Sequence, residues 1–250
     1  ALSGALPTGV PFSNNGDGTA TLTGTPALGT AGSYPLTITA SNASGIDASQ
    51  NFTLTVLKAA AAVSVTAAPN PSVFGQEVTF TATVTSSAGT PTGVVQFTLN
   101  GGNLGTPVAL ADGIATLTVT TLGTGAHTIG AVYAGDANYA PASGTLPVGQ
   151  TVIQAATTTT LTAVLGGSLF QPVLLLEAVV EPVAPGAGVP TGTVTFTDGV
   201  TTMETVPLDA SGRASVVVPG IAPGSYTWTA TYSGDSNFAP SNHTVGAFVP

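Results

Sequence analysis

The sequence predicts an all-β protein, and three observations carry that prediction. Thr, Val and Ile fill short alternating runs, the pattern of strands that bury one face. Gly, Pro, Asn and Asp separate these runs, as turn residues do between strands, and the chain contains 32 Gly and 19 Pro. No stretch shows the 3.6-residue apolar spacing of an amphipathic helix. Because disordered chains are poor in β-branched residues, we expect this one to fold.

Composition excludes several classes of function. Only 5% of the residues are charged, and the two cations, Lys58 and Arg213, oppose eleven carboxylates for a net charge of −9. Such a surface repels a phosphate backbone, so we expect no nucleic-acid partner. The chain has no Cys and two imidazoles, His127 and His243, which leaves no thiolate metal site and few catalytic bases. No apolar run reaches the roughly 20 residues that span a bilayer, and because the chain does not open with a basic segment followed by an apolar one, we expect no signal peptide there.

The chain repeats itself. Residues 91–141 match residues 190–240 at a constant offset, from a Pro-Thr-Gly at Pro91 and Pro190 to an Ala-Pro at Pro141 and Pro240. Such internal similarity indicates duplicated domains. The third domain adds a Pro- and Gly-rich insertion within residues 181–189, which we predict to be a loop.

Residues 1–57 carry a weaker version of the same plan, with Pro7-Thr8-Gly9, a hairpin turn at residues 14–18 and Gly32-Ser33-Tyr34. We therefore predict three domains, at residues 1–57, 58–154 and 155–250. The boundaries contain no flexible Gly/Ser run, so semi-rigid junctions are expected. Only six residues precede Pro7, so the first domain should lack its first strands. Either the chain is an excerpt of a longer protein, or another chain inserts a strand.

One stretch of the third domain indicates which face of a strand is buried. Tyr226, Trp228 and Tyr232 alternate with threonines, and successive strand side chains point to opposite faces. We predict that the aromatic face is core, with Tyr133 as the counterpart of Tyr232 in the second domain. About seven such strands in roughly 95 residues are typical of an immunoglobulin-like sandwich.

A Gly-x-Tyr before a late strand is typical of a tyrosine corner, in which the phenol bonds back to nearby backbone. The sequence places Tyr34 and Tyr226 at this position. His127 takes the same position in the second domain and is predicted to substitute for the tyrosine.

These motifs carry a family resemblance. Residues 63–250 resemble two copies of the bacterial Ig-like repeat domain, through Pro-Thr-Gly, Gly-x-His/Tyr and Tyr-x-Gly-Asp-x-Asn-Tyr/Phe-Ala-Pro. Residues 1–57 resemble the C-terminal part of the cadherin-like Ig module of bacterial surface proteins, through residues 6–9, 16–26 and 34–42. The resemblance implies tandem Ig-like sandwiches in an elongated rod, as stalk or binding modules of secreted and cell-surface proteins.

Two Asp-x-Asn pairs are candidate calcium ligands: Asp136 with Asn138, and Asp235 with Asn237. Calcium takes six to eight oxygens, however, and few other carboxylates lie close in sequence. Asp and Asn also form ordinary turns by bonding local backbone. We favour turns, and expect neither a metal nor another cofactor.

No catalytic constellation is evident, because neither His127 nor His243 accompanies a Gly-x-Ser-x-Gly elbow or a comparable setting. We predict that the chain is not an enzyme. Its predicted role is a stalk or spacer of an extracellular bacterial surface protein. Its partners are then other domains or copies of the chain, with cell-surface glycans as a further candidate. The alternatives are a glycan- or receptor-binding adhesin segment, a subunit of a filament or sheath assembled by strand complementation, or Ig-like domains of a virion.

Overall fold

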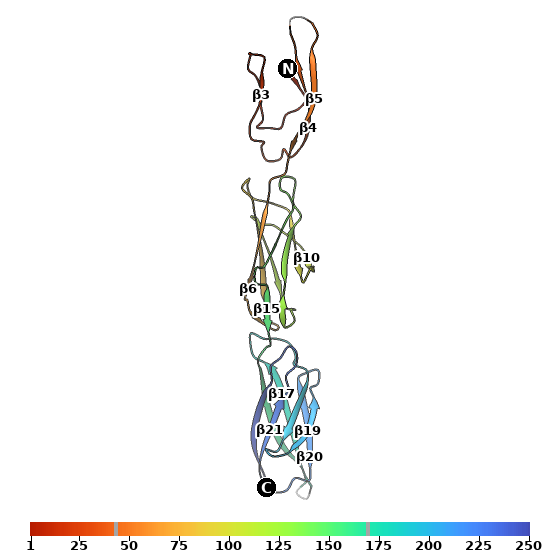
Figure 1. Ribbon diagram of the computed structural model, residues 1–250. Helices are drawn as coiled ribbons and strands as arrows, with labels where there is room; N and C mark the ends of the chain where they lie inside the picture. The colour runs from red at the N-terminus through yellow and green to blue at the C-terminus, as the bar shows by residue number, and fades with distance from the viewer. Residues whose placement is uncertain (43–44, 169–170) are drawn as a thin grey trace. The chain divides into compact units, whose positions relative to one another are not determined.

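A computed structural model describes residues 1–42, 45–168 and 171–250 (Figure 1). Every regular element in those residues is a β-strand, so the predicted all-β fold is confirmed. Backbone contacts divide the chain into two compact units. The first comprises residues 1–66, 81–117 and 128–147, and the second comprises residues 67–80, 118–127 and 148–250.

Residues 1–57 form the strands β1 (Leu2–Ser3), β2 (Phe12–Asn14), β3 (Ala20–Leu22), β4 (Gly32–Ala40) and β5 (Ala48–Val56). β4 lies between β1 and β5, and the hairpin turn predicted at residues 14–18 joins β2 to β3 (Figure 1). Pro35 does not shift the register of β4, because it pairs with Thr53 in an unbroken ladder. Tyr34, Leu36 and Ile38 therefore share one face of β4; on that face Leu36 is buried, whereas Ile38 is 36% exposed.

The first unit also contains the second repeat's larger sheet, in the order β10-β9-β13-β14. These strands are β9 (Val94–Leu99), β10 (Gly102–Ala109), β13 (Ile129–Tyr133) and β14 (Ala142–Thr145). Alternate residues face inward, so Phe97, Ile129 and Tyr133 are fully buried. The strands β6 (Ala62–Ala68), β8 (Val78–Thr85) and β11 (Ile114–Val119) form a second sheet in the order β11-β8-β6.

In the second unit, three short strands complete the second repeat: β7 (Ser72–Val73), β12 (Gly125–His127) and β15 (Gln150–Ile153). β15 lies between the other two and pairs with β7 in parallel, Val152 opposite Ser72. The buried Gln150 side chain donates to the Pro69 carbonyl (3.2 Å) and the Ser72 hydroxyl (3.1 Å). These bonds tie the start of β15 to the segment that leads into β7.

The third repeat is a sandwich of two antiparallel sheets, ordered β16-β17-β20 and β19-β18-β21-β22. Its strands are β16 (Thr157–Ser168), β17 (Gln171–Pro182), β18 (Thr193–Thr197), β19 (Thr202–Pro207), β20 (Arg213–Pro219), β21 (Gly224–Tyr232) and β22 (Ser241–Val249). On β21, Trp228 and Tyr232 belong to the buried core cluster, while the Thr229 hydroxyl bonds to that of Thr244 on β22 (2.9 Å). The aromatic side chains and the threonines thus occupy the two faces that their alternation predicts.

Candidate functional site

The two repeated motifs, Pro-Thr-Gly and Asp-x-Asn, meet at one carboxylate. In the second repeat, Asp136 Oδ2 accepts the backbone N–H (3.1 Å) and the hydroxyl (2.6 Å) of Thr92. Its Oδ1 accepts the N–H groups of Asn138 (2.7 Å) and Tyr139 (2.8 Å). Four donors therefore surround this side chain, and a loop far away in sequence is tied to the turn.

The third repeat builds the same arrangement around Asp235. Thr191 donates its N–H (2.9 Å) and hydroxyl (2.5 Å) to Oδ2, and Asn237 and Phe238 donate their N–H groups to Oδ1 (2.7 and 2.8 Å). The glycine before the aspartate is required for this turn. Gly234 has φ of +75°, and a Cβ there would lie 3.0 Å from the Phe238 carbonyl oxygen.

These bonds determine the protonation of both aspartates. Burial alone would raise the pKa of Asp136, but the Thr92 hydroxyl and the N–H groups of Asn138, Tyr139 and Thr92 outweigh it and hold the pKa well below 3.8. The same balance lowers the pKa of Asp235. Burial, together with the nearby aspartate, raises the pKa of Tyr133 and of Tyr232 to about 12. Both sites therefore hold a carboxylate beside a neutral phenol at neutral pH.

The Asp-x-Asn turn also holds the residues that enter each repeat. In the first unit, Ala59 donates its N–H to the Asn138 carbonyl (2.8 Å), and Ala140 donates to the Ala59 carbonyl (2.9 Å). Lys58 Nζ donates to the carbonyl of Asp136. We call this arrangement, the entering pair Lys58-Ala59 bound to the turn 136–140, a linker clamp.

A second linker clamp joins Gln154-Ala155 to the turn 235–239. Ala155 donates its N–H to the Asn237 carbonyl (2.9 Å) and accepts from Ala239 (2.8 Å). Gln154 Nε2 donates to the Asp235 carbonyl (2.6 Å), the position that Lys58 contacts at Asp136. The sequence prediction missed both clamps. The shared position of Lys58 and Gln154 just ahead of each repeat, with a side-chain donor in both, was the available signal.

The predicted calcium ligands lie in these turns. The carboxylate group of Asp136 accepts four hydrogen bonds in total, two at each oxygen, and so does that of Asp235. Within the described part of the chain, no three His, Asp or Glu side chains gather into a group able to hold a metal ion. The choice of a turn over a calcium site remains a prediction.

Three side chains take the corner position and bond to the carbonyl four residues earlier. The Tyr34 hydroxyl donates to Thr30 (2.7 Å) and the Tyr226 hydroxyl to Ala222 (3.0 Å). In the second repeat, His127 Nε2 lies 2.7 Å from the Gly123 carbonyl oxygen, so the imidazole makes the bond that the phenols make elsewhere. Tyr226 also stacks on Trp228, with ring centroids 5.3 Å apart, which joins the corner to the core.

His243, Glu177 and Arg213 bond to neighbouring strands. His243 Nδ1 accepts the N–H of Leu161 (3.0 Å). Glu177 pairs with Arg213 across β17 and β20 at 2.8 Å, and both side chains are substantially exposed, so this pair contributes little to stability. The hydrogen bond of His243 and the ion pair of Glu177 with Arg213 each join two strands, and this role accounts for these side chains without a catalytic function.

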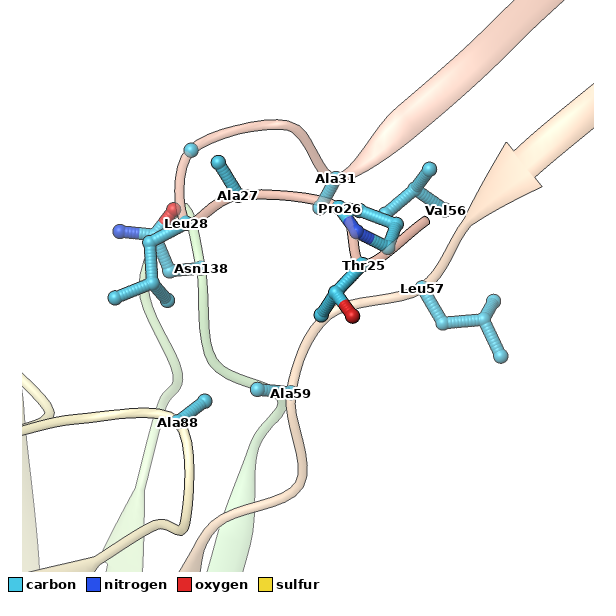
Figure 2. A pocket seen from close by; sticks show the side chains of 11 residues that line it. Thr25, Pro26, Ala27, Leu28, Ala31, Val56, Leu57, Ala59, Ala88 and Asn138 are labelled. Carbon is cyan, nitrogen blue, oxygen red and sulfur yellow. The ribbon is translucent and has the colours of Figure 1, made fainter. Parts of the chain in front are cut away.

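A cavity of 340 Å³ lies in the first unit. Segment 25–29 lines it, together with residues that include Leu57, Ala59, Ala88 and Asn138 (Figure 2). Its lining contains no charged side chain. Asn138 Oδ1 is buried there without a hydrogen-bond partner. The cavity thus offers a small apolar surface with the Thr25 hydroxyl and the Asn138 amide, too little polar chemistry to define a ligand.

The family Bacterial Ig-like domain (group 3) matches residues 65–154 and 148–249, and the family Putative Ig domain matches residues 1–57. Both predicted resemblances are confirmed. No curated protein matches the chain.

Solved structures similar to this chain include three bacterial adhesins. The Yersinia pseudotuberculosis adhesin InvE is 22% identical, with 75% of this chain and 59% of that chain covered and a TM-score of 0.37. The Escherichia coli adhesin FdeC is 19% identical (100% and 84% covered, TM-score 0.31). A 1.5-MDa bacterial ice-binding adhesin is 18% identical (85% and 72% covered, TM-score 0.30).

Residues 1–42, 45–168 and 171–250 contain no helix that is long and apolar enough to cross a membrane.

Proposed function

Because this chain belongs to the Bacterial Ig-like domain (group 3) family, we propose that it is a stalk or spacer segment of an extracellular bacterial surface protein. The observation that supports this role best is the linker clamp, which the chain builds once in each unit. A stalk carries load along its chain, and that load enters each repeat at the linker. A clamp at this point keeps the linker attached to its own repeat when the chain is pulled.

The composition supports the same role. A protein outside the cell meets proteases, and only Lys58 and Arg213 offer sites to a trypsin-like enzyme. An adhesin that binds glycans usually presents several exposed aromatic rings. The single Trp, Trp228, is 2% exposed, and Phe248 is the one aromatic ring among the exposed large hydrophobic residues of the described chain. We therefore favour a stalk over a glycan-binding segment, and we propose no catalytic role.

Pulling the full chain by its two ends in a single-molecule force experiment tests the proposal. The second and third repeats should unfold in separate cooperative events, and Asp136→Asn should lower the force of one event only. Asp209→Asn is the matched control, because Asp209 also accepts backbone N–H groups in a turn but does not bind a linker. Smooth extension at low force, or saturable binding of the chain to a glycan array, would contradict the stalk.

A further inference from the structure

The 183–189 loop of the third repeat lies against residues 73–75 of the second repeat. Both segments belong to the second unit. Ala187 donates its N–H to the Phe74 carbonyl (3.3 Å), and at the base of the loop Val183 donates its N–H to the Ala156 carbonyl (2.8 Å). The loop predicted as an insertion is thus anchored to its own repeat at one end and contacts the preceding repeat at the other.

Glycines allow the two segments to approach closely. A Cβ on Gly75 would lie 2.3 Å from the Ala187 carbonyl oxygen, and a Cβ on Gly186 would lie 2.6 Å from the Ala155 Cβ. A Cβ on Gly188 would lie 3.2 Å from the Phe238 ring. Real Cβ atoms do not come within 3.0 Å of such neighbours. At Gly75 and Gly186, therefore, any side chain would push the loop away.

An aromatic pair and a hydrogen bond accompany the loop. Phe74 meets Phe238 edge to face, with ring centroids 5.3 Å apart and planes at 81°, a favourable arrangement for aromatic side chains. Val73 and Phe74 pack against the buried core cluster of the third repeat. The Thr124 hydroxyl donates to the Ser236 carbonyl (2.8 Å). None of these groups is charged, so the contact does not depend on ionic attraction.

The corresponding place in the first unit is built differently. Asn138 holds the position of Asn237, but its side-chain oxygen is buried without a partner. It borders the 340 Å³ cavity, which segment 25–29 also lines (Figure 2). Among the described residues, the edge-to-face aromatic pair of Phe74 and Phe238 belongs to the second unit.

We infer that the 183–189 loop is a lock, which together with Phe74 and Phe238 holds residues 67–80 and the third repeat in one fixed orientation. This inference does not depend on the proposed function, because an adhesin segment with the same contacts would be held in the same way. It predicts that loss of the loop contact frees residues 67–80 from the third repeat without unfolding the third repeat.

The test uses the full chain with Gly75→Ala. Its matched control is Gly101→Ala, because Gly101 has a similar φ (+85° against +78°) but a Cβ added there would meet no atom within 4 Å. Both variants carry the cost of a side chain at positive φ, and only Gly75→Ala collides with the loop. Since the chain has no Cys, spin labels at Thr118→Cys and Glu204→Cys, both exposed positions, report the distance between the repeats by pulsed electron resonance.

We expect a narrow distance distribution for the parent chain and for Gly101→Ala, and a broad one for Gly75→Ala. The amide of Ala187 should also exchange its hydrogen about fivefold faster in Gly75→Ala, as loss of one hydrogen bond predicts. Phe74→Ala should broaden the distance distribution to the same extent. It replaces Gly75→Ala in the test if that variant does not fold. A broad distribution in the parent chain, or equal widths for both glycine variants and Phe74→Ala, would overturn the lock.

Discussion

The second and third repeats share the aspartate turn, the linker clamp and the corner bond, but their first strands differ in path and pairing. In the second repeat β6 ends at Ala68, and after Pro69 and Pro71 the chain forms β7, which pairs with β15. In the third repeat β16 pairs with β17 along its whole length. Proline has no N–H and interrupts a ladder, and residues 157–168 contain none. The shared motifs thus determine the turn and the corner, and proline placement decides the path of the first strand.

Without a counterpart of β7, the third repeat joins β16 to β22 through side chains. The Thr157 hydroxyl donates to the Ala239 carbonyl and to Ser241 Oγ (2.8 Å each), and Thr159 bonds to Ser241 (2.7 Å). His243 continues the series by accepting the N–H of Leu161 (3.0 Å). In the third repeat, hydrogen bonds of side chains thus connect β16 to β22, whereas in the second repeat backbone hydrogen bonds connect β7 to β15.

The largest expected effect concerns the core position that the repeats fill with different residues. Trp228 and its counterpart Ile129 are both buried. Trp228→Ala should lower the free energy of unfolding by about 3–5 kcal/mol, and Ile129→Ala by about 2–5 kcal/mol. Circular dichroism in urea measures both. Thr229→Ala is the control; it loses one hydrogen bond to Thr244 and should lower the free energy of unfolding by no more than about 1.5 kcal/mol. A loss equal to that of Trp228→Ala would mean that the strand faces the other way.

The aspartate turns should be equivalent in the two repeats. Asp136→Asn and Asp235→Asn each remove a charged acceptor of four hydrogen bonds, so each should cost about 1.5–3 kcal/mol at pH 7 in the same urea titration. Thr92→Ala, which removes one of those donors, should cost less. A neutral result for either asparagine variant would show that the repeat does not depend on its turn.

Acid should remove the difference in stability between the parent chain and the asparagine variants. Because the pKa of Asp136 and of Asp235 is lowered in the folded protein, their contribution is complete above the unfolded pKa of about 3.9 and is lost as the pH falls through the folded pKa. Melting temperatures of the parent and of Asp136→Asn should therefore converge below about pH 4. A gap that persists undiminished at pH 2 would contradict the role of the ionised carboxylate.

The side-chain series of the third repeat should contribute less. His243→Ala removes the acceptor of the Leu161 N–H and should cost about 0.5–1.5 kcal/mol. Asn242→Ala, at the adjacent exposed position, should have no measurable effect. Equal melting temperatures for the two variants would show that β16 and β22 do not rely on the imidazole.

The smallest expected effect is that of calcium. With both carboxylates occupied by protein donors, thermal melts of the full chain in calcium and in chelator should coincide. A rise of several degrees in saturating calcium would show binding to the folded state and would favour the calcium interpretation of Asp136 and Asp235.

Sequence patterns were sufficient for the strands, because alternation of Thr with Trp228 and Tyr232 specifies a face and Gly-Asp specifies a turn. They were not sufficient for the linker clamps. Those are made largely by backbone groups, such as the Ala59 N–H and the Asn138 carbonyl, and every residue carries such groups. The contact between Gly75 and Ala187 could not be predicted from the sequence either. A glycine indicates that a side chain would not fit at its position, but it does not indicate which residue lies there.

The linker clamp also has a consequence for how such a chain can gain or lose repeats by gene duplication. All of its parts lie between the entering pair and the end of the same repeat, so a gene segment copied from Lys58 or from Gln154 onward carries its own attachment point. The neighbour upstream need supply no particular residue for the clamp to form. New copies can therefore be inserted or removed one at a time without redesign of the clamp, whereas the contact of the 183–189 loop with Gly75 requires that particular pair of neighbours.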